Sequence, residues 1–228
     1  MSVLRQLLSV FRGPNSLDAA TEDFSQMLEL ALSMVVRASD DFFGAGLAPA
    51  ERTRIYEQDV RVNQYERQIR KLVVAHLSGA RSADVPYGLL LMSLVKDVER
   101  LGDYAKNLVE VPELRRGEFP DDEYYRELLE IKASVVDLAK EVGPVYSRGD
   151  TERAHQLTLQ GRSVAKRCDQ LVARVARSDY SANLAIALTL GARFFKRIEG
   201  HLLNVLSSVI MPLHKLDYFD EDVAPKIR

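Results

Sequence analysis

Apolar side chains recur along this sequence at the spacing of an α-helix, and prolines and glycines divide the pattern into six long segments. The clearest case is residues 86–112, where apolar residues three or four positions apart form one face of a helix. The members of this stripe are Leu90, Leu94, Val98, Leu101, Ala105 and Leu108. No stretch shows the strict alternation of apolar and polar residues that is typical of a half-buried strand. The sequence therefore predicts an all-α protein.

The breaks between segments give approximate helix boundaries. The six predicted helices cover residues 16–43, 49–77, 86–112, 121–146, 150–178 and 181–212. Pro49 suits the first turn of the second helix, and Asp150 suits the N-cap of the fifth. Pro112 is expected to stop the third helix. Gly143-Pro144 is expected to kink or end the fourth, because proline removes a backbone donor and clashes with the preceding turn.

The order of the helices indicates a three-helix unit that occurs twice. Arg100 and Asn107 recur as Arg197 and Asn204, 97 residues later, and an aliphatic residue follows each arginine. The second and fifth helices align at a shift of 102, and a longer loop at 79–86 accounts for the difference. The predicted parts are an amphipathic segment 1–14, three-helix units 15–112 and 121–212, and an acidic tail 213–228.

Composition excludes several classes of protein. Hydrophobic residues make up 46% and charged residues 28%, as in an ordinary soluble domain. The net charge of −2 provides no basic field for a phosphate backbone, so we expect no nucleic-acid partner. The one cysteine, Cys168, excludes an internal disulfide framework and fits a reducing compartment. No run of 18 apolar residues occurs, so we expect a cytoplasmic protein that reaches a membrane only through a partner.

A polar stripe borders the apolar face of the second predicted helix, and another lies opposite the apolar stripe of the third. Their members are Asp59, Asn63, Glu66 and Arg70 on the second helix, and Glu99, Asp103 and Asn107 on the third. A short loop joins these helices, so we expect them to be antiparallel neighbours whose carboxylates converge. Oxygen ligands without cysteine suit Mg²⁺, iron or manganese. The same spacing also fits a solvated helix face with ordinary ion pairs.

Motifs for other chemistry are absent from the sequence. None of the four histidines stands in a Glu-x-x-His motif of the kind that di-iron bundles use. There is no phosphate-binding glycine loop ending in Lys-Ser/Thr and no Gly-x-Ser-x-Gly elbow. Cys168 is interpreted as a buried or idle thiol. The sequence therefore favours a protein that is not an enzyme.

The stretch Lys96–Glu110 resembles the signature of the PhoU family. The resemblance lies in the core Glu99-Arg100-Leu101-Gly102-Asp103, with Asp97 before it and Asn107 and Glu110 after it. Asp59, Asn63 and Glu66 resemble the partner motif on the second helix of each repeat. The resemblance extends over residues 17–212. It implies a non-catalytic intracellular adaptor that regulates phosphate uptake and links a phosphate transporter to a sensor kinase.

The resemblance also implies a metal site, because acidic pairs in PhoU proteins form metal clusters on the surface. A divalent or iron-type ion would be held in the first unit by Asp59, Asn63, Glu66, Glu99 and Asp103. In the second unit, Gly161, Lys196 and Gly200 replace Asp59, Glu99 and Asp103. A lysine repels a cation, so we expect at most one cluster, in the first unit.

Three hypotheses follow. The first is the PhoU-like adaptor, acting as a homodimer and docking through its polar helix faces and acidic tail. The second is a carboxylate-metal enzyme in which Asp59, Glu66, Glu99 and Asp103 hold an ion that activates water. The third is a purely structural dimer built on an apolar run in the last helix. That run consists of Leu202, Leu203, Val205, Leu206, Val209, Ile210 and Met211.

Overall fold

A computed structural model of the 228-residue chain describes residues 16–44, 48–79, 82–115 and 117–216. In these ranges it contains six long helices and no strand, which confirms the all-α prediction. The helices are α2 (Ser16–Asp41), α3 (Pro49–Leu77), α4 (Val85–Leu114), α5 (Glu123–Arg148), α6 (Thr151–Val175) and α7 (Ala182–Ile210). Two short 3₁₀ turns, η1 (Ser82–Asp84) and η2 (Leu213–Lys215), precede α4 and follow α7.

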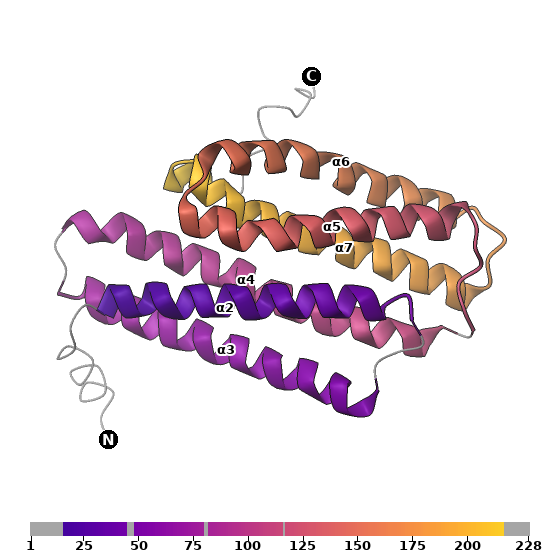
Figure 1. The fold of residues 1–228 in the computed structure, drawn as a ribbon, viewed down its shortest axis with the longest axis horizontal. Helices are drawn as coiled ribbons and strands as arrows, with labels where there is room; N and C mark the ends of the chain where they lie inside the picture. The colour runs from indigo at the N-terminus through magenta and orange to yellow at the C-terminus, as the bar shows by residue number, and fades with distance from the viewer. Residues whose placement is uncertain (1–15, 45–47, 80–81, 116, 217–228) are drawn as a thin grey trace.

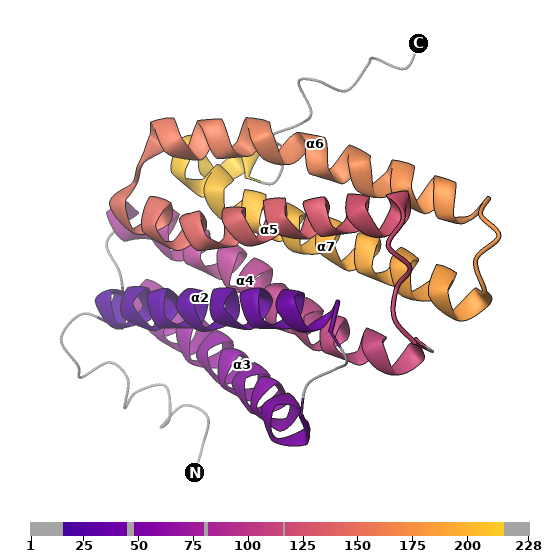
Figure 2. The same cartoon turned by 45° about the vertical axis from the view of Figure 1, so that its right-hand side comes forward.

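The helices form two three-helix units that lie side by side. α2, α3 and α4 pack together in the lower half of Figure 1, and α5, α6 and α7 pack together in the upper half. The main seam between the units is α4 against α7, with a smaller contact of α2 against α5. Figure 2 shows the same two layers after rotation. The predicted pair of three-helix units is therefore confirmed.

The two units share one hydrophobic core. A cluster of aromatic rings joins them where the end of α2, the α4–α5 connection and α7 meet. The ring centroid of Phe42 lies 5.7 Å from that of Phe195 and 5.8 Å from that of Phe119. Phe43 lies 5.7 Å from Tyr125 in an edge-on arrangement. These separations are those of favourable ring pairs, so the cluster fixes the second unit against the first.

Pro112 does not stop its helix, and Gly143-Pro144 does not end its own. α4 continues past Pro112 to Leu114, and α5 continues past Pro144 to Arg148. A proline inside a helix costs roughly 3 kcal/mol through the lost hydrogen bond and the clash with the preceding turn. In α5, Val142 and Val145 on either side of the proline are buried in the core. Burying such side chains contributes about 1.5–3 kcal/mol each, which offsets that cost.

α5 ends instead at Gly149, which adopts φ +63°. This left-handed conformation suits glycine because it has no Cβ. The N–H groups of Gly149 and Asp150 donate to the carbonyls of Tyr146 and Val145, each at 3.1 Å, and so close a Schellman motif. The side chain of Asp150 then accepts from the backbone N–H of Arg153 at 3.0 Å, which confirms its predicted role as the N-cap of α6.

Both predicted end segments fall largely outside the described residues. The amphipathic segment 1–14 lies outside them entirely, and of the acidic tail only 213–216 is described. Among the described helices, none combines the length and the apolar character that a membrane span requires.

The close approach of Phe42 to α7 generates a stability prediction. A Cβ added at Gly191 would overlap the Phe42 ring. Gly191→Ala is therefore expected to lower the free energy of unfolding by about 1–3 kcal/mol through overpacking. Gly200 lies on the same helix, and a Cβ added there would have nothing within 4 Å. Gly200→Ala is therefore expected to raise the free energy of unfolding by about 0.5–1 kcal/mol. Urea denaturation followed by circular dichroism measures both, and similar effects of the two variants would contradict this packing.

Candidate functional site: a charged network between α3 and α4

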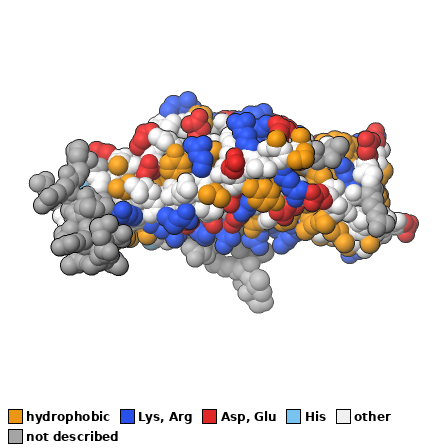
Figure 3. Space-filling view, turned by 90° about the horizontal axis from the view of Figure 1, so that it is seen from below, with side chains coloured by type: hydrophobic (Ala, Val, Ile, Leu, Met, Phe, Trp, Pro, Cys, Tyr) orange, Lys and Arg blue, Asp and Glu red, His pale blue; other side chains and the backbone are white. Residues whose placement is uncertain are grey.

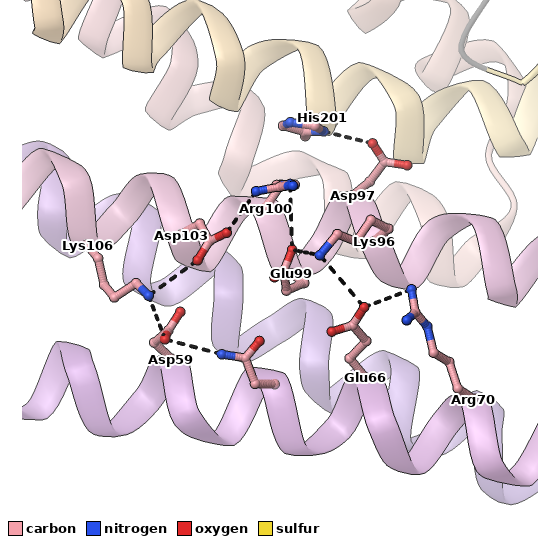
Figure 4. A network of polar contacts seen from close by, with 11 residues as sticks. Asp59, Glu66, Arg70, Lys96, Asp97, Glu99, Arg100, Asp103, Lys106 and His201 are labelled. Atoms are coloured by element: carbon pink, nitrogen blue, oxygen red, sulfur yellow. Dashed lines mark hydrogen bonds and ion pairs between the residues drawn. The ribbon is translucent and has the colours of Figure 1, made fainter.

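Four carboxylates face one another along the edge where α3 and α4 meet. Asp59 and Glu66 project from α3, and Glu99 and Asp103 project from α4 (Figure 4). They stand beside the apolar stripes that hold the two helices together, so burial of the stripes draws them partly out of water. Asp59, Glu66 and Glu99 are only 6–8% exposed. Carboxylates removed from water to this extent need cationic or hydrogen-bonding partners.

Lys106 neutralises the first pair of carboxylates. Its Nζ lies 2.8 Å from Oδ2 of Asp59 and 3.3 Å from Oδ1 of Asp103. Asn63 donates to the same Asp59 oxygen at 3.3 Å, and Arg100 donates to Oδ2 of Asp103 at 3.2 Å. Burial lowers the pKa of Lys106, but the hydrogen bonds and negative charges of Asp59 and Asp103 outweigh it and leave that pKa raised.

Lys96 neutralises the second pair. Its Nζ lies 2.7 Å from Oε2 of Glu99 and 4.0 Å from Oε1 of Glu66. Arg70 lies 2.9 Å from the same Glu66 oxygen, and Nε of Arg100 lies 3.8 Å from Glu99 Oε2. Oε1 of Glu66 and Oε2 of Glu99 lie within ion-pair distance of these cationic groups but form no hydrogen bond. Their partners therefore stabilise them chiefly through charge.

The network as arranged does not fit a metal ion. Its four carboxylates are matched by Arg70, Lys96, Arg100 and Lys106, so no net negative charge remains to attract a cation. Within the described ranges, no three His, Cys, Asp or Glu side chains are grouped as a metal site would require. The ammonium groups of two lysines occupy the places between carboxylates that an ion would need. The predicted metal site therefore stays a prediction, and it requires both lysines to move away.

The remaining residues of the PhoU-like motif have other contacts. Asp97 points away from the network towards α7, where His201 Nδ1 and Asn204 Nδ2 each lie 2.8 Å from its Oδ1. Glu110 accepts a hydrogen bond from the Tyr56 hydroxyl at 2.6 Å, and Asn107 is half-buried on α4. The contact of His201 between the two units was not predicted from the sequence, where the histidines entered only in excluding a Glu-x-x-His motif.

The pairing of Asp59 with Lys106 generates a second prediction. Lys106→Met leaves the buried Asp59 carboxylate without its ammonium partner. Breaking a fully buried pair costs about 3–5 kcal/mol, and because Lys106 is partly exposed we expect a loss of about 2 kcal/mol in the free energy of unfolding. Asp59→Asn added to the same chain should recover most of this loss.

Urea denaturation of the single and double variants measures the effect. The control is Lys140→Met, since Lys140 is 61% exposed and lies 3.9 Å from Asp137, where a surface pair contributes only about 0.5 kcal/mol. Failure of the second substitution to recover stability would contradict the charge-balancing role of Lys106.

The second unit places a different carboxylate at the equivalent crossing. Lys196 pairs with Asp169, while Glu199 lies buried against Gly161 with 1% of its surface exposed. Oε1 of Glu199 has no hydrogen-bond partner. Burial raises the pKa of Glu199 to about 8, although Lys196 acts in the opposite direction. The sequence analysis missed this residue; the available signal was an acidic residue between Phe195 and Leu202 on the apolar stripe of α7.

Glu199 generates a pH-dependent prediction. Because its pKa is raised on folding from an ordinary value of 4.5 to about 8, the folded chain holds a proton that the unfolded chain has released. The contribution of Glu199 to stability therefore falls as pH rises between these values. Glu199→Gln removes the titrating group and should abolish this loss of stability. The free energy of unfolding of the variant minus that of the unmodified protein should therefore increase by several kcal/mol from pH 5 to pH 8.

Chemical denaturation at a series of pH values measures this difference. Glu152→Gln removes an exposed carboxylate at the start of α6 and should give a difference that stays flat with pH. A flat difference for Glu199→Gln would show that Glu199 titrates normally.

Comparison with known proteins finds similarity to the PhoU domain and to solved PhoU structures. Residues 24–111, which include all four network carboxylates, match the PhoU domain family model. The crystal structure of PhoU from Pseudomonas aeruginosa superposes with a TM-score of 0.76 at 21% identity, covering 85% of this chain and 95% of that one. The phosphate transport system regulatory protein PhoU from Streptococcus pneumoniae gives a TM-score of 0.71 at 13% identity, covering 88% and 94%. No curated protein gives a significant match. The resemblance predicted from residues 96–110 is thus confirmed: the chain contains a PhoU domain and has the PhoU fold.

Proposed function

We propose that this chain regulates phosphate transport as a non-catalytic adaptor that binds a phosphate transporter or its sensor kinase on the cytoplasmic side. The observation that carries the proposal is the PhoU domain in residues 24–111, together with the charged network that it contains. The Streptococcus pneumoniae protein with the same fold is described as a phosphate transport system regulatory protein. The proposal extends that role to this chain.

The surface beside the network has the character of a docking site for another protein. The side chains of Arg70, Lys96 and Arg100 are 44–47% exposed although their charged groups pair with the network carboxylates. On the outward side of α3, Tyr56 and Val60 are 36% and 52% exposed. Figure 3, which views the molecule from the side where α3 lies, shows hydrophobic side chains scattered between acidic and basic ones. Such a mixed surface suits contact with a protein partner.

Catalysis has weaker support. The carboxylate-metal enzyme needs a metal ion held by Asp59, Glu66, Glu99 and Asp103. These carboxylates are already paired with lysine and arginine side chains. A metal ion on the network, with Asn63 as a further ligand, remains a separate proposal for a state in which Lys96 and Lys106 are displaced.

The structural-dimer hypothesis relied on an apolar run of α7. Four of its seven members, Leu202, Leu203, Val205 and Leu206, are at most 2% exposed and so are covered within the chain itself. The other three, Val209, Ile210 and Met211, are partly exposed. A homodimer formed through another surface remains part of the proposal.

The test is genetic and uses a matched pair of surface variants. Deletion of the chain is expected to make phosphate uptake and phosphate-responsive gene expression insensitive to external phosphate. The unmodified gene should restore regulation. Val60→Asp should fail to restore it, because it places a charge on the proposed docking surface. Leu159→Asp is the control, since Leu159 lies on α6 and is also 52% exposed.

Both variants should be folded and equally abundant, as substitutions at exposed positions change stability little. Radiolabelled phosphate uptake and a reporter gene provide the two readouts. Deletion without effect on either would overturn the proposed function. Restoration by Val60→Asp would instead exclude the α3 surface as the docking site.

A further inference from the structure

A cavity of about 350 Å³ lies between α5, α6 and α7 in the second unit. Its polar lining comes from all three helices and includes Asp137 and Glu141 of α5, Gln160 of α6 and Glu199 of α7. No lysine or arginine is part of this lining. Glu141 is paired with Arg153, and Asp137 lies 3.9 Å from Lys140. Of the three carboxyl groups in the lining, that of Glu199 is therefore the buried one without an ion-pair partner.

Glu199 is placed there by a missing side chain on the facing helix. A Cβ added at Gly161 would lie 2.9 Å from Oε1 of Glu199 and at a similar distance from the methyl groups of Leu203. The glycine thus leaves room for the carboxyl group to enter the interior. Glu199 is 1% exposed, and its Oε1 accepts no hydrogen bond. A buried acceptor without a donor is costly, so the site lacks a hydrogen-bond donor.

The first unit shows which donor is missing. There, Asp59 of α3 faces Gly102 of α4, with 3.4 Å between Oδ1 and an added Cβ. The second unit reverses the pair: the glycine, Gly161, is on α6 and the carboxyl, Glu199, is on α7. These positions correspond at the offsets that separate the helix starts, 102 residues for α3 and α6 and 97 for α4 and α7.

In the first unit the ammonium group of Lys106 lies 2.8 Å from the Asp59 carboxylate. The residue 97 positions later is Leu203, which is 2% exposed and packs against Gly161. The second unit therefore has a buried carboxyl group opposite a glycine, but a leucine stands where the first unit has the neutralising lysine. The cavity opens beside this carboxyl group.

We propose that this cavity binds an alkylammonium group, with the –NH₃⁺ against Glu199 in the way that Lys106 pairs with Asp59. An ammonium provides three donors, and Gln160 and the hydroxyl groups of Ser134 and Ser163 supply further acceptors along the lining. The side chains of Leu138 and Leu157 provide an apolar wall for the alkyl chain. A bare metal ion fits less well, because no three acidic, His or Cys ligands gather among the described residues.

An alkylammonium group can come from a free amine or from a lysine side chain, and two probes distinguish these sources. Isothermal titration calorimetry at pH 8.5, where Glu199 is largely ionised, would use 1,4-diaminobutane and Nα-acetyl-lysine methylamide, with 1,4-butanediol as the uncharged analogue. At least one amine is expected to bind saturably, while the diol does not bind. Diamine binding alone would indicate a free amine, and binding of the lysine derivative alone would indicate a lysine of another protein.

Three variants tie the binding to this cavity. Glu199→Gln is expected to weaken amine binding roughly ten- to a hundredfold, since it removes the charged partner of the ammonium. Leu203→Lys is expected to abolish binding by supplying an internal ammonium at the position of Lys106. Glu152→Gln removes an exposed carboxylate of α6 outside the cavity and should bind as the unmodified protein does. Circular dichroism verifies that each variant is folded.

The proposal is overturned if neither amine binds to the unmodified protein, or if Glu199→Gln binds as tightly as the unmodified protein. It does not rest on the proposed role in phosphate regulation. The calorimetry uses purified protein, so failure of the cavity to bind amines and failure of the genetic test are separate outcomes.

Discussion

Both three-helix units bury a carboxyl group opposite a glycine where their second and third helices cross, and a buried charge must be neutralised. In the first unit Asp59 stands against Gly102, and Lys106 supplies the positive charge at 2.8 Å. This ion pair is part of a chain of alternating charges along the α3–α4 edge. Each carboxylate there is within 4.0 Å of a lysine or arginine. In the second unit Glu199 is also buried, but no lysine stands at the position that corresponds to Lys106. Burial raises the pKa of Glu199 to about 8.

The two units also show that the fold and the network are separate properties of the sequence. Only residues 24–111 match the PhoU domain model, whereas the structural likeness to PhoU proteins covers 85–88% of the chain. The second unit has Gly161, Lys196 and Gly200 where the first has Asp59, Glu99 and Asp103, yet it also packs as three helices. Apolar stripes are what bury surface and stabilise helix packing. The charged residues can therefore change while the helices stay in place.

This separation explains how much the sequence could predict. Helix number and approximate bounds follow from periodicity and from signals such as Pro49 and Asp150, because these are local properties. α4 extends only two residues beyond Pro112, to the exposed Leu114. α5 continues past Pro144 because burial of Val142 and Val145 offsets the cost of a proline inside the helix. That burial depends on tertiary contacts, which no local pattern contains.

The candidate site was also predicted only in part: its carboxylates were predicted, but their lysine partners were not. Spacing placed Asp59, Glu66, Glu99 and Asp103 on facing edges, and the structure brings them together there. The spacing did not predict that the ammonium groups of Lys96 and Lys106 would lie between these carboxylates. A long flexible side chain can point in several directions from one backbone position. Glu199 was missed for another reason: the sequence comparison followed the acidic positions of the first unit. The buried acidic residue of the second unit instead stands at the position that Gly102 has in the first.

Asp97 connects these two environments. It belongs to the motif that carries the resemblance to PhoU proteins, but it lies on the side of α4 that faces α7. His201 and Asn204 each contact its Oδ1 at 2.8 Å, and His201 is two residues from Glu199 on the same helix. The Tyr104 ring, also on α4, stacks on His201 with 5.8 Å between centroids. The polar residues of the first unit and the cavity of the second are therefore linked through one packed helix pair, α4 and α7.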